Sequence, residues 1–165
     1  MNKIYLSIGS NTGDRKRNLN ESYLRISKLG EARGSHIYRA EPWGRDDLPE
    51  FLNACISLES KLCLKDLFHS IQIIEKEMGR IKKEKWGSRI IDIDILISQD
   101  LIFKSPQLEV PHPFLRERRF YLEPLCEIAE EERDPISGKK IKVLLEECSD
   151  RKKVWKTGNI LQLKA

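Results

Sequence analysis

The sequence predicts an α+β protein, because segments with the residue period of a β-strand and segments with that of an α-helix alternate along the chain. Apolar residues recur at every second position in the predicted strands and at every third or fourth position in the predicted helices. The order strand, helix, strand, strand, helix, strand is that of a ferredoxin-like βαββαβ core. The strands are residues 4–8, 34–41, 51–58 and 91–97, and the helices are residues 14–29 and 64–78.

A turn bounded by Gly9 and Gly13 joins the first strand to the first helix. The turn lacks the Gly-Lys-Ser ending of a phosphate-binding P-loop, so we interpret it as structural. The helix over 14–29 is amphipathic and stops before Gly30, a residue type common at helix ends. After the next extended segment, a loop rich in proline and glycine over 42–49 is long enough to cover a site.

The strand over 51–58 carries Phe51 and Asn53 on the face opposite its aliphatic residues. An aromatic ring beside an amide suits a flat heterocycle, since the ring can stack on it and the amide can pair with its edge. A core aromatic next to a satisfied asparagine is an equally good interpretation. Phe120 is a candidate for a second aromatic wall, or else a residue of a helix core.

Two carboxylates interrupt the apolar strand over 91–97. Asp92 and Asp94 share one face, because successive side chains of a strand point to opposite faces. Their Cα atoms are expected about 6.6 Å apart, so both carboxylates could bind one divalent cation or bridge a pair. Ile91, Ile93, Ile95 and Ile97 are predicted to share the other face, against the helices.

A basic segment precedes these acids, with Glu84 as its one opposing charge. Such a segment can neutralise a polyphosphate that brings its own metal ions. A bare Asp-x-Asp pair more often faces water at the surface of a half-exposed sheet, and a lone basic segment is usually solvated. Because the two adjoin here, we favour nucleotide chemistry. The basic residues are Arg80, Lys82, Lys83, Lys85 and Arg89.

The remainder of the chain is predicted to cover the second face of the sheet, which gives a three-layer α/β/α sandwich. Residues 100–103 are expected to add an edge strand, residues 114–128 a helix and residues 142–148 a short helix, with a turn over 134–139. From residue 151 onward the chain is polar enough to predict a loosely held tail.

Two further features of this region could contact an anion. His112 lies between two prolines, in a stiff loop from which an imidazole could donate to a phosphate oxygen. Arg116, Arg118 and Arg119 form a second basic cluster. We interpret the cluster as surface charge, although one of its arginines could reach a triphosphate.

Composition excludes several classes of protein. At 165 residues the chain suits one domain spanning residues 1–165. A net charge of +4, from 30 basic and 26 acidic residues, does not demand nucleic acid or membrane as a partner. Four cysteines without a Cys-x-x-Cys pair predict reduced thiols. The first apolar segment is too short for a signal peptide and no apolar segment approaches membrane length, so we expect a cytoplasmic protein. The predicted elements leave no unpaired apolar stripe, so we expect a monomer.

Residues 86–96, WGSRIIDIDIL, resemble the signature of the 6-hydroxymethyl-7,8-dihydropterin pyrophosphokinase family of folate synthesis. The resemblance extends along nearly the whole chain in the same order. It includes the segments at 8–11, 38–39, 51–54, 79–80 and 110–112.

The resemblance implies transfer of an intact diphosphate from ATP to the hydroxymethyl oxygen of the pterin, with two Mg²⁺ ions held partly by Asp92 and Asp94. It also implies arginine catalysis and a tryptophan lid that closes over the bound substrates. The implied catalytic arginines are Arg80 and Arg89, the lid residue is Trp86, the pterin contacts are Ala40, Pro42, Trp43, Gly44, Phe51, Asn53 and Phe120, and the ATP contacts are Gln72, Glu75, His112 and Arg118.

Three residues depart from the family pattern: Ala40 and Glu41 replace threonine and proline, and Pro113 replaces an aromatic residue.

Two other functions fit parts of the sequence. An RNA-recognition domain shares the order of elements but needs aromatic residues on its central strands, where this chain has aspartates. A two-metal nuclease would also use an Asp-x-Asp pair, but the long pocket loop and paired aromatics favour a small heterocycle.

Overall fold

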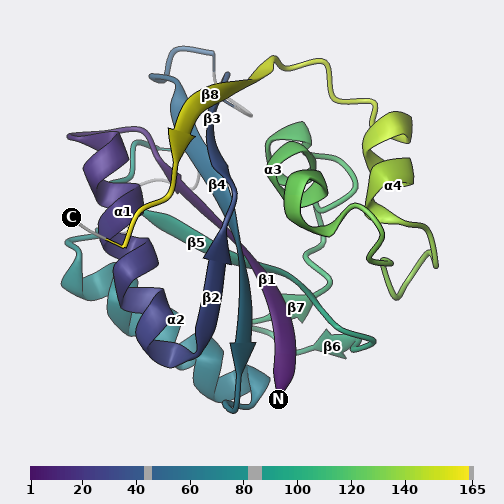
Figure 1. The fold of residues 1–165 in the computed structure, drawn as a ribbon. Coiled ribbons are helices and arrows are strands. Elements are labelled where there is room, and N and C mark those ends of the chain that lie inside the picture. Colours follow the sequence, from purple (N-terminus) through teal and green to yellow (C-terminus); the bar gives the residue numbers. More distant parts are fainter. Residues whose placement is uncertain (43–45, 82–86, 164–165) are drawn as a thin grey trace.

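The computed structural model describes residues 1–42, 46–81 and 87–163. Within these ranges, six strands form one sheet in the order β5, β1, β4, β3, β8, and β2 also pairs with β4 (Figure 1). The strands are β1 Asn2–Ser10, β2 Glu31–Gly34, β3 His36–Ala40, β4 Phe51–Ser60, β5 Asp92–Ser98 and β8 Val154–Ile160.

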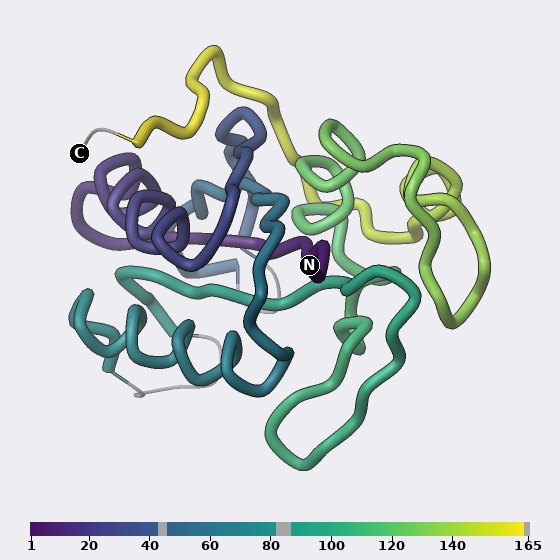
Figure 2. Tube along the Cα trace, turned by 60° about the horizontal axis from the view of Figure 1, so that its bottom comes forward, coloured from purple at the N-terminus to yellow at the C-terminus, as the bar shows by residue number. Residues whose placement is uncertain are grey.

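Helices cover both faces of this sheet (Figures 1 and 2), so the predicted α/β/α layering and the α+β fold class are confirmed. One face carries α1 (Arg15–Ile26) and α2 (Leu64–Glu77), and the other carries α3 (Arg119–Ala129) and α4 (Ile141–Glu147). In α1 the Asp14 carboxylate accepts the N–H of Arg17 at 3.1 Å, a standard N-cap. A short 3₁₀ turn, Ser27–Leu29, completes the helix predicted to run to residue 29.

The order β1, α1, β2 with β3, β4, α2, β5 is the predicted ferredoxin-like core. The expected strand over 34–41 is divided at Ser35 into β2 and β3, which pair with opposite ends of β4. The central strands β1 and β4 pair antiparallel along their whole length, with Gly9 opposite Asn53. On its other side β1 pairs with β5, which places Gly9 opposite Asp92 and Ser7 opposite Asp94.

The two faces of β5 bury different side chains. Ile91, Ile93 and Ile95 pack in the core under α1 and α2, as predicted. Ile97 was predicted on that face but packs instead with Leu96 in the core under α3 and α4. A shift in the β1–β5 register, which follows Ile95 in β5, is the physical reason, because an extra residue in one strand reverses the faces of those beyond it.

The edge strand predicted over 100–103 is wrong. Asp100 has φ of 53°, a left-handed conformation that belongs to a turn. The chain then forms β6 (Phe103–Lys104), which pairs with β7 (Glu109–Val110) in a separate two-stranded sheet. The helix predicted from residue 114 begins only at Arg119, because turns occupy residues 113–117.

The prediction of a loosely held tail is also wrong. Strand β8 pairs antiparallel with β3 at the edge of the sheet, and an edge strand is stabilised by its backbone hydrogen bonds even where its side chains are polar and exposed. Beyond it, Leu161 is 5% exposed and packs over Gly34, where an added Cβ would lie 2.8 Å from Leu161 Cδ1.

Close packing at Gly30, the residue that follows the 3₁₀ turn, can be tested by substitution. A Cβ there would lie 2.1 Å from the backbone oxygen of Glu59, which cannot rotate away. We expect Gly30→Ala to lower the free energy of unfolding by about 2–3 kcal/mol. Gly158→Ala is the matched control, since its Cβ would have no neighbour within 4 Å. Urea titrations in which both variants unfold at the same denaturant concentration would contradict this account.

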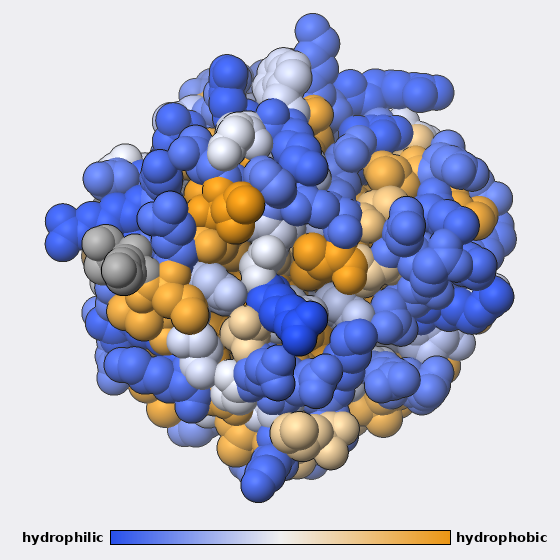
Figure 3. Space-filling model, viewed as in Figure 1, coloured by the Kyte–Doolittle hydropathy of each residue, from blue (hydrophilic) through white to orange (hydrophobic). Residues whose placement is uncertain are grey.

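The face of the molecule turned toward the viewer in Figure 3 is mainly hydrophilic, with hydrophobic residues in small separate groups. Among the described residues, no helix combines the length and apolar character needed to cross a bilayer.

Candidate active site

A cavity of about 760 Å³ opens on the α3 side of the sheet, where β1, β4 and β5 meet the loop before α3. Most residues predicted from the sequence line it. They are Ala40, Phe51, Asn53, Gln72, Glu75, Arg80, Arg89, Asp92, Asp94, His112, Arg118 and Phe120.

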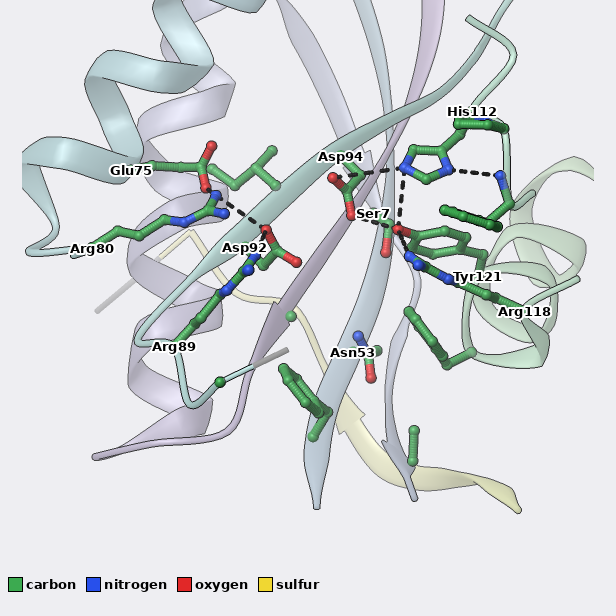
Figure 4. A pocket seen from close by; sticks show the side chains of 18 of the residues that line it. Ser7, Asn53, Glu75, Arg80, Arg89, Asp92, Asp94, His112, Arg118 and Tyr121 are labelled. Carbon is green, nitrogen blue, oxygen red and sulfur yellow. Dashed lines mark hydrogen bonds and ion pairs between the residues drawn. The ribbon is translucent and has the colours of Figure 1, made fainter. Parts of the chain in front are cut away.

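Figure 4 shows two groups of charged side chains on opposite sides of this cavity, with Asp94 between them. On one side, Asp92 Oδ1 lies 3.1 Å from Arg80 Nη1 and 3.2 Å from Arg89 Nη1. Arg80 also forms an ion pair with Glu75 of α2. The two arginines are therefore anchored by carboxylates from β5 and α2, and their positive charge is fixed beside the cavity.

Asp92 occupies an unusual electrostatic position. Burial raises its pKa, and the nearby charge of Asp94 raises it further, while Arg80 and Arg89 act in the opposite direction; the net pKa is about 6. Two carboxylates forced onto one strand face repel each other. Such a pair gains from a cation placed between them.

Asp94, which lies between the two groups, contacts the second group through its carboxylate. Its Oδ2 accepts a hydrogen bond of 2.5 Å from the hydroxyl of Tyr121, which itself accepts one of 2.8 Å from Arg118 Nη1. Burial raises the pKa of Tyr121 well above its usual value, and the charge of Asp94 adds to this effect. The phenol is therefore a neutral hydrogen-bond donor.

His112 faces the same group from the loop after β7. Its backbone N–H donates to Leu96 of β5, and its Nδ1 accepts the N–H of Phe114 at 3.1 Å. Burial, with a smaller contribution from Arg118, lowers the pKa of His112 to about 4. The neutral ring accordingly carries its proton on Nε2, 4.0 Å from Asp94 Oδ1 and on the cavity side.

The end of the cavity formed by Phe51 and Asn53 has fewer charged side chains. Asn53 is 3% exposed, and its side-chain oxygen has no hydrogen-bond partner in the described part of the chain. Phe51 precedes it on β4, and Gly9 faces it on β1, where an added Cβ would lie 2.6 Å from Asn53 Nδ2. A buried acceptor without a partner is costly, so this end of the cavity is suited to a ligand that donates a hydrogen bond.

The turn after β1 has a second role besides joining two elements. Asn11 Oδ1 accepts the backbone N–H of Arg89 at 2.7 Å, and the Asn11 N–H donates to the Arg89 carbonyl at 3.2 Å. This pair of bonds fixes the backbone of Arg89. Our interpretation of the turn as purely structural missed this contact, because nothing local in sequence joins residues 11 and 89.

Four predicted residues are not placed at the cavity. Pro42 is described and buried, but it is not among the residues that line the cavity. Trp43, Gly44 and Trp86 lie outside the described residues, as do Lys82, Lys83 and Lys85.

The cavity also contains residues that sequence reasoning did not assign to the site. Of these, Gly87 and Pro113 adjoin motifs already noted, whereas Tyr121 carried no signal beyond helical spacing. The unassigned lining residues are Ser7, Gly9, Glu41, Phe68, Lys76, Gly87, Ile93, Gln107, Pro113, Phe114 and Tyr121.

The interpretation of the second basic cluster as surface charge is wrong. Arg118 is 7% exposed and lines the cavity. Arg116 donates to the buried Asp134 at 2.7 Å, and Arg119 donates to the backbone carbonyl of Asp150 and to Glu123. The three arginines thus have different partners, and of the three only Arg118 is among the residues that line the cavity.

The donor set is compatible with magnesium. Among the described residues, no cluster of three or more His, Cys, Asp or Glu side chains could hold a metal by itself. Magnesium does not require one, since it usually retains water and binds one or two carboxylates together with substrate phosphates. Asp92 and Asp94, adjacent on one strand face and under mutual repulsion, fit that requirement.

A ferredoxin-like sheet with paired carboxylates, anchored arginines and an aromatic-amide end fits the class of nucleotide-dependent phosphotransferases that act on a small heterocycle. Comparison with known proteins gives the family. A profile described as 7,8-dihydro-6-hydroxymethylpterin-pyrophosphokinase (HPPK) matches residues 5–130, and the chain belongs to that family. Membership confirms the expected function, pyrophosphokinase activity in folate biosynthesis.

Relatives named 2-amino-4-hydroxy-6-hydroxymethyldihydropteridine pyrophosphokinase match most of the chain. The Aquifex aeolicus protein is 38% identical over 148 residues, which cover 86% of this chain and 89% of the relative. The Pseudomonas aeruginosa protein is 33% identical over 149 residues, covering 88% and 91%. The Porphyromonas gingivalis protein is 41% identical over 134 residues, covering 76% and 90%.

Solved structures share the fold. A Plasmodium falciparum HPPK-DHPS crystal structure aligns with a TM-score of 0.72 at 16% identity, covering 88% of this chain and 45% of that one. A second structure of the same protein, with the ligand STZ-DHP, gives 0.70 at 15% identity with the same coverage. This chain thus spans less than half the length of those proteins.

Proposed function

We propose that this protein transfers the terminal diphosphate of ATP to the hydroxymethyl oxygen of 6-hydroxymethyl-7,8-dihydropterin and releases AMP. Family membership supports this reaction. The observation that carries the residue assignments is that one cavity collects a carboxylate pair, two anchored arginines and a buried amide next to an aromatic ring.

The pterin occupies the end of the cavity formed by Asn53 and the aromatic residues. Its ring lies between Phe51 and Phe120, and its donor edge pairs with the unsatisfied oxygen of Asn53. Backbone groups of Ala40 and Pro42 bind the remaining edge, and the family resemblance assigns further contacts there to Trp43 and Gly44, which lie outside the described residues.

The nucleotide occupies the charged end. Gln72 and Glu75 of α2 contact the nucleoside, while His112 and Arg118 donate to phosphate oxygens. The neutral His112 suits this role because, with a pKa of about 4, its ring can donate the Nε2–H to a phosphate oxygen without changing its own charge near neutral pH. The family resemblance assigns the lid over both substrates to Trp86, which lies outside the described residues; such a lid would exclude water during transfer.

In the reaction, the pterin oxygen forms a bond to the β-phosphorus, and the bond from that phosphorus to the oxygen bridging the α- and β-phosphates breaks. The bridging oxygen leaves with AMP, and the hydroxyl proton passes to solvent. Arg80 and Arg89 hold fixed positive charge where negative charge develops on the phosphate oxygens. Asp92 and Asp94 would hold two Mg²⁺ ions, which supply further neutralisation of those oxygens.

We also propose that the enzyme acts as a cytoplasmic monomer, without a nucleic-acid or membrane partner. The free thiols of Cys55, Cys63, Cys126 and Cys148 are typical of a reducing compartment.

Incubating the purified protein with magnesium, ATP and the hydroxymethyl pterin tests the reaction. AMP and the pterin diphosphate should form together, and only when the pterin is present. ADP as the product would indicate single-phosphate transfer, and cleavage of DNA without ATP would indicate the nuclease alternative. Either outcome would contradict the proposal.

A further inference from the structure

Tyr121, on the first turn of α3, is among the residues that line the cavity. Its side chain is 1% exposed, and the hydroxyl lies between Asp94 and Arg118 (Figure 4). We infer that Tyr121 is a positioning residue, which holds the Asp94 carboxylate in the orientation needed for metal binding and links it to Arg118. This inference rests on the proposed role of Asp94.

Three groups surround this hydroxyl, and two of them determine the direction of its hydrogen bonds; the third, His112 Nε2, lies 3.5 Å away. A guanidinium can only donate and a carboxylate can only accept, so Arg118 donates to the hydroxyl and the hydroxyl donates to Asp94. The distances are 2.8 Å from Arg118 Nη1 and 2.5 Å to Asp94 Oδ2. Arg118 polarises the hydroxyl, which strengthens its bond to the carboxylate.

Packing fixes the tyrosine ring and therefore the position of the hydroxyl. The His112 ring lies edge-on to it with centroids 5.0 Å apart, and the Phe120 ring lies 4.6 Å away on the same helix. The body of the ring is part of the core under α3, with Tyr5, Leu96 and Leu122. A hydroxyl held this rigidly restricts the rotation of the carboxylate that it binds.

The two oxygens of Asp94 therefore have different surroundings and different roles. Oδ2 is occupied by Tyr121, while Oδ1 lies 4.0 Å from His112 Nε2 on the cavity side. Hydrogen bonds to a metal-binding carboxylate orient it, and loss of such a bond typically weakens metal affinity by about 10–100-fold. Tyr121 also connects a proposed phosphate contact, Arg118, to a proposed metal ligand.

The test is Tyr121→Phe, which removes the hydroxyl and keeps the buried ring. Tyr5→Phe is the matched control. Tyr5 is also 1% exposed in the same core, but its hydroxyl donates to Glu132 at 3.0 Å, away from the cavity. We expect Tyr121→Phe to raise the Mg²⁺ concentration that half-saturates the reaction by at least about 10-fold, with the KM for the pterin unchanged.

Binding measured without turnover provides a second readout. Calorimetry with Mn²⁺ and the α,β-methylene analogue of ATP, in the absence of pterin, should show a similar loss of Mn²⁺ affinity for Tyr121→Phe and none for Tyr5→Phe. Equal Mn²⁺ affinity of wild type and Tyr121→Phe would overturn the inference. So would equal losses in the two tyrosine variants, which would indicate a general effect on stability.

Asp94→Asn separates this inference from the proposed function. If Asp94→Asn loses Mn²⁺ binding and Tyr121→Phe does not, the positioning role is wrong and the metal assignment stands. If Asp94→Asn binds Mn²⁺ and the analogue like wild type, the metal assignment itself is wrong, and the inference about Tyr121 is overturned with it.

Discussion

Replacing Asp92 or Asp94 with asparagine is expected to lower the rate of AMP formation by on the order of 10²–10³-fold. An amide carries no negative charge, so it cannot balance a divalent cation between the two positions. In Asp92→Asn the two arginines that contact this carboxylate at 3.1 and 3.2 Å also lose their counter-charge. Initial rates at saturating ATP and pterin, followed by separation of AMP, measure the effect.

Asp100→Asn is the control for these variants. Asp100 follows the same strand but lies in an exposed turn with φ of 53°, a conformation that asparagine also adopts readily. Its activity should equal that of wild type. Normal turnover by both Asp92→Asn and Asp94→Asn would show that the reaction does not depend on these carboxylates.

Asn53→Ala is expected to raise the KM for the pterin by about 100-fold while leaving the affinity for ATP unchanged. Asn53 is 3% exposed, and its side-chain oxygen has no partner among the described residues, so in our assignment the pterin satisfies it. Removal of the amide leaves the buried donors of the pterin without an acceptor. Steady-state kinetics with each substrate varied in turn distinguishes the two affinities.

A second buried asparagine serves as control. Asn20 is 6% exposed and accepts the backbone N–H of Gln162 at 2.9 Å, on the far face of the sheet from the cavity. Asn20→Ala should therefore lower stability and leave the pterin KM near that of wild type. A pterin KM that is the same in Asn53→Ala and in wild type would place the pterin elsewhere.

Much of the fold was predictable because it depends on the period of apolar residues. The alternation through β1, β4 and β5 and the helical spacing in α1 and α2 identified the ferredoxin-like core. The prediction was wrong where strand pairing or strand register determines which elements form and which face a residue takes. Strand β8 mixes polar residues with exposed hydrophobic ones such as Trp155 and Ile160, and its partner β3 lies more than a hundred residues earlier, so no period of buried residues could reveal it.

The same distinction applies to the candidate site, where strand geometry could assign some residues and tertiary packing determined the others. Asp92, Asp94 and Asn53 could be assigned to one face from strand geometry, and the cavity indeed contains all three. Asn11 and Tyr121 could not be assigned, because each acts through a partner distant in sequence: Arg89 for Asn11, and Asp94 for Tyr121. Their roles depend on how loops and helices pack against the sheet.

The sequence by itself determined which side chains of β1, of β4 and of β5 as far as Ile95 lie on the α1–α2 face and which lie on the cavity face, because a residue's face follows from its position in a two-residue period. Only the tertiary structure decided which groups from different elements meet. It brings α3 over β5 so that Tyr121 binds Asp94, and the turn after β1 against Arg89. Hydrogen bonds act over about 3 Å, so the contacts that orient the site exist only once the whole chain is packed.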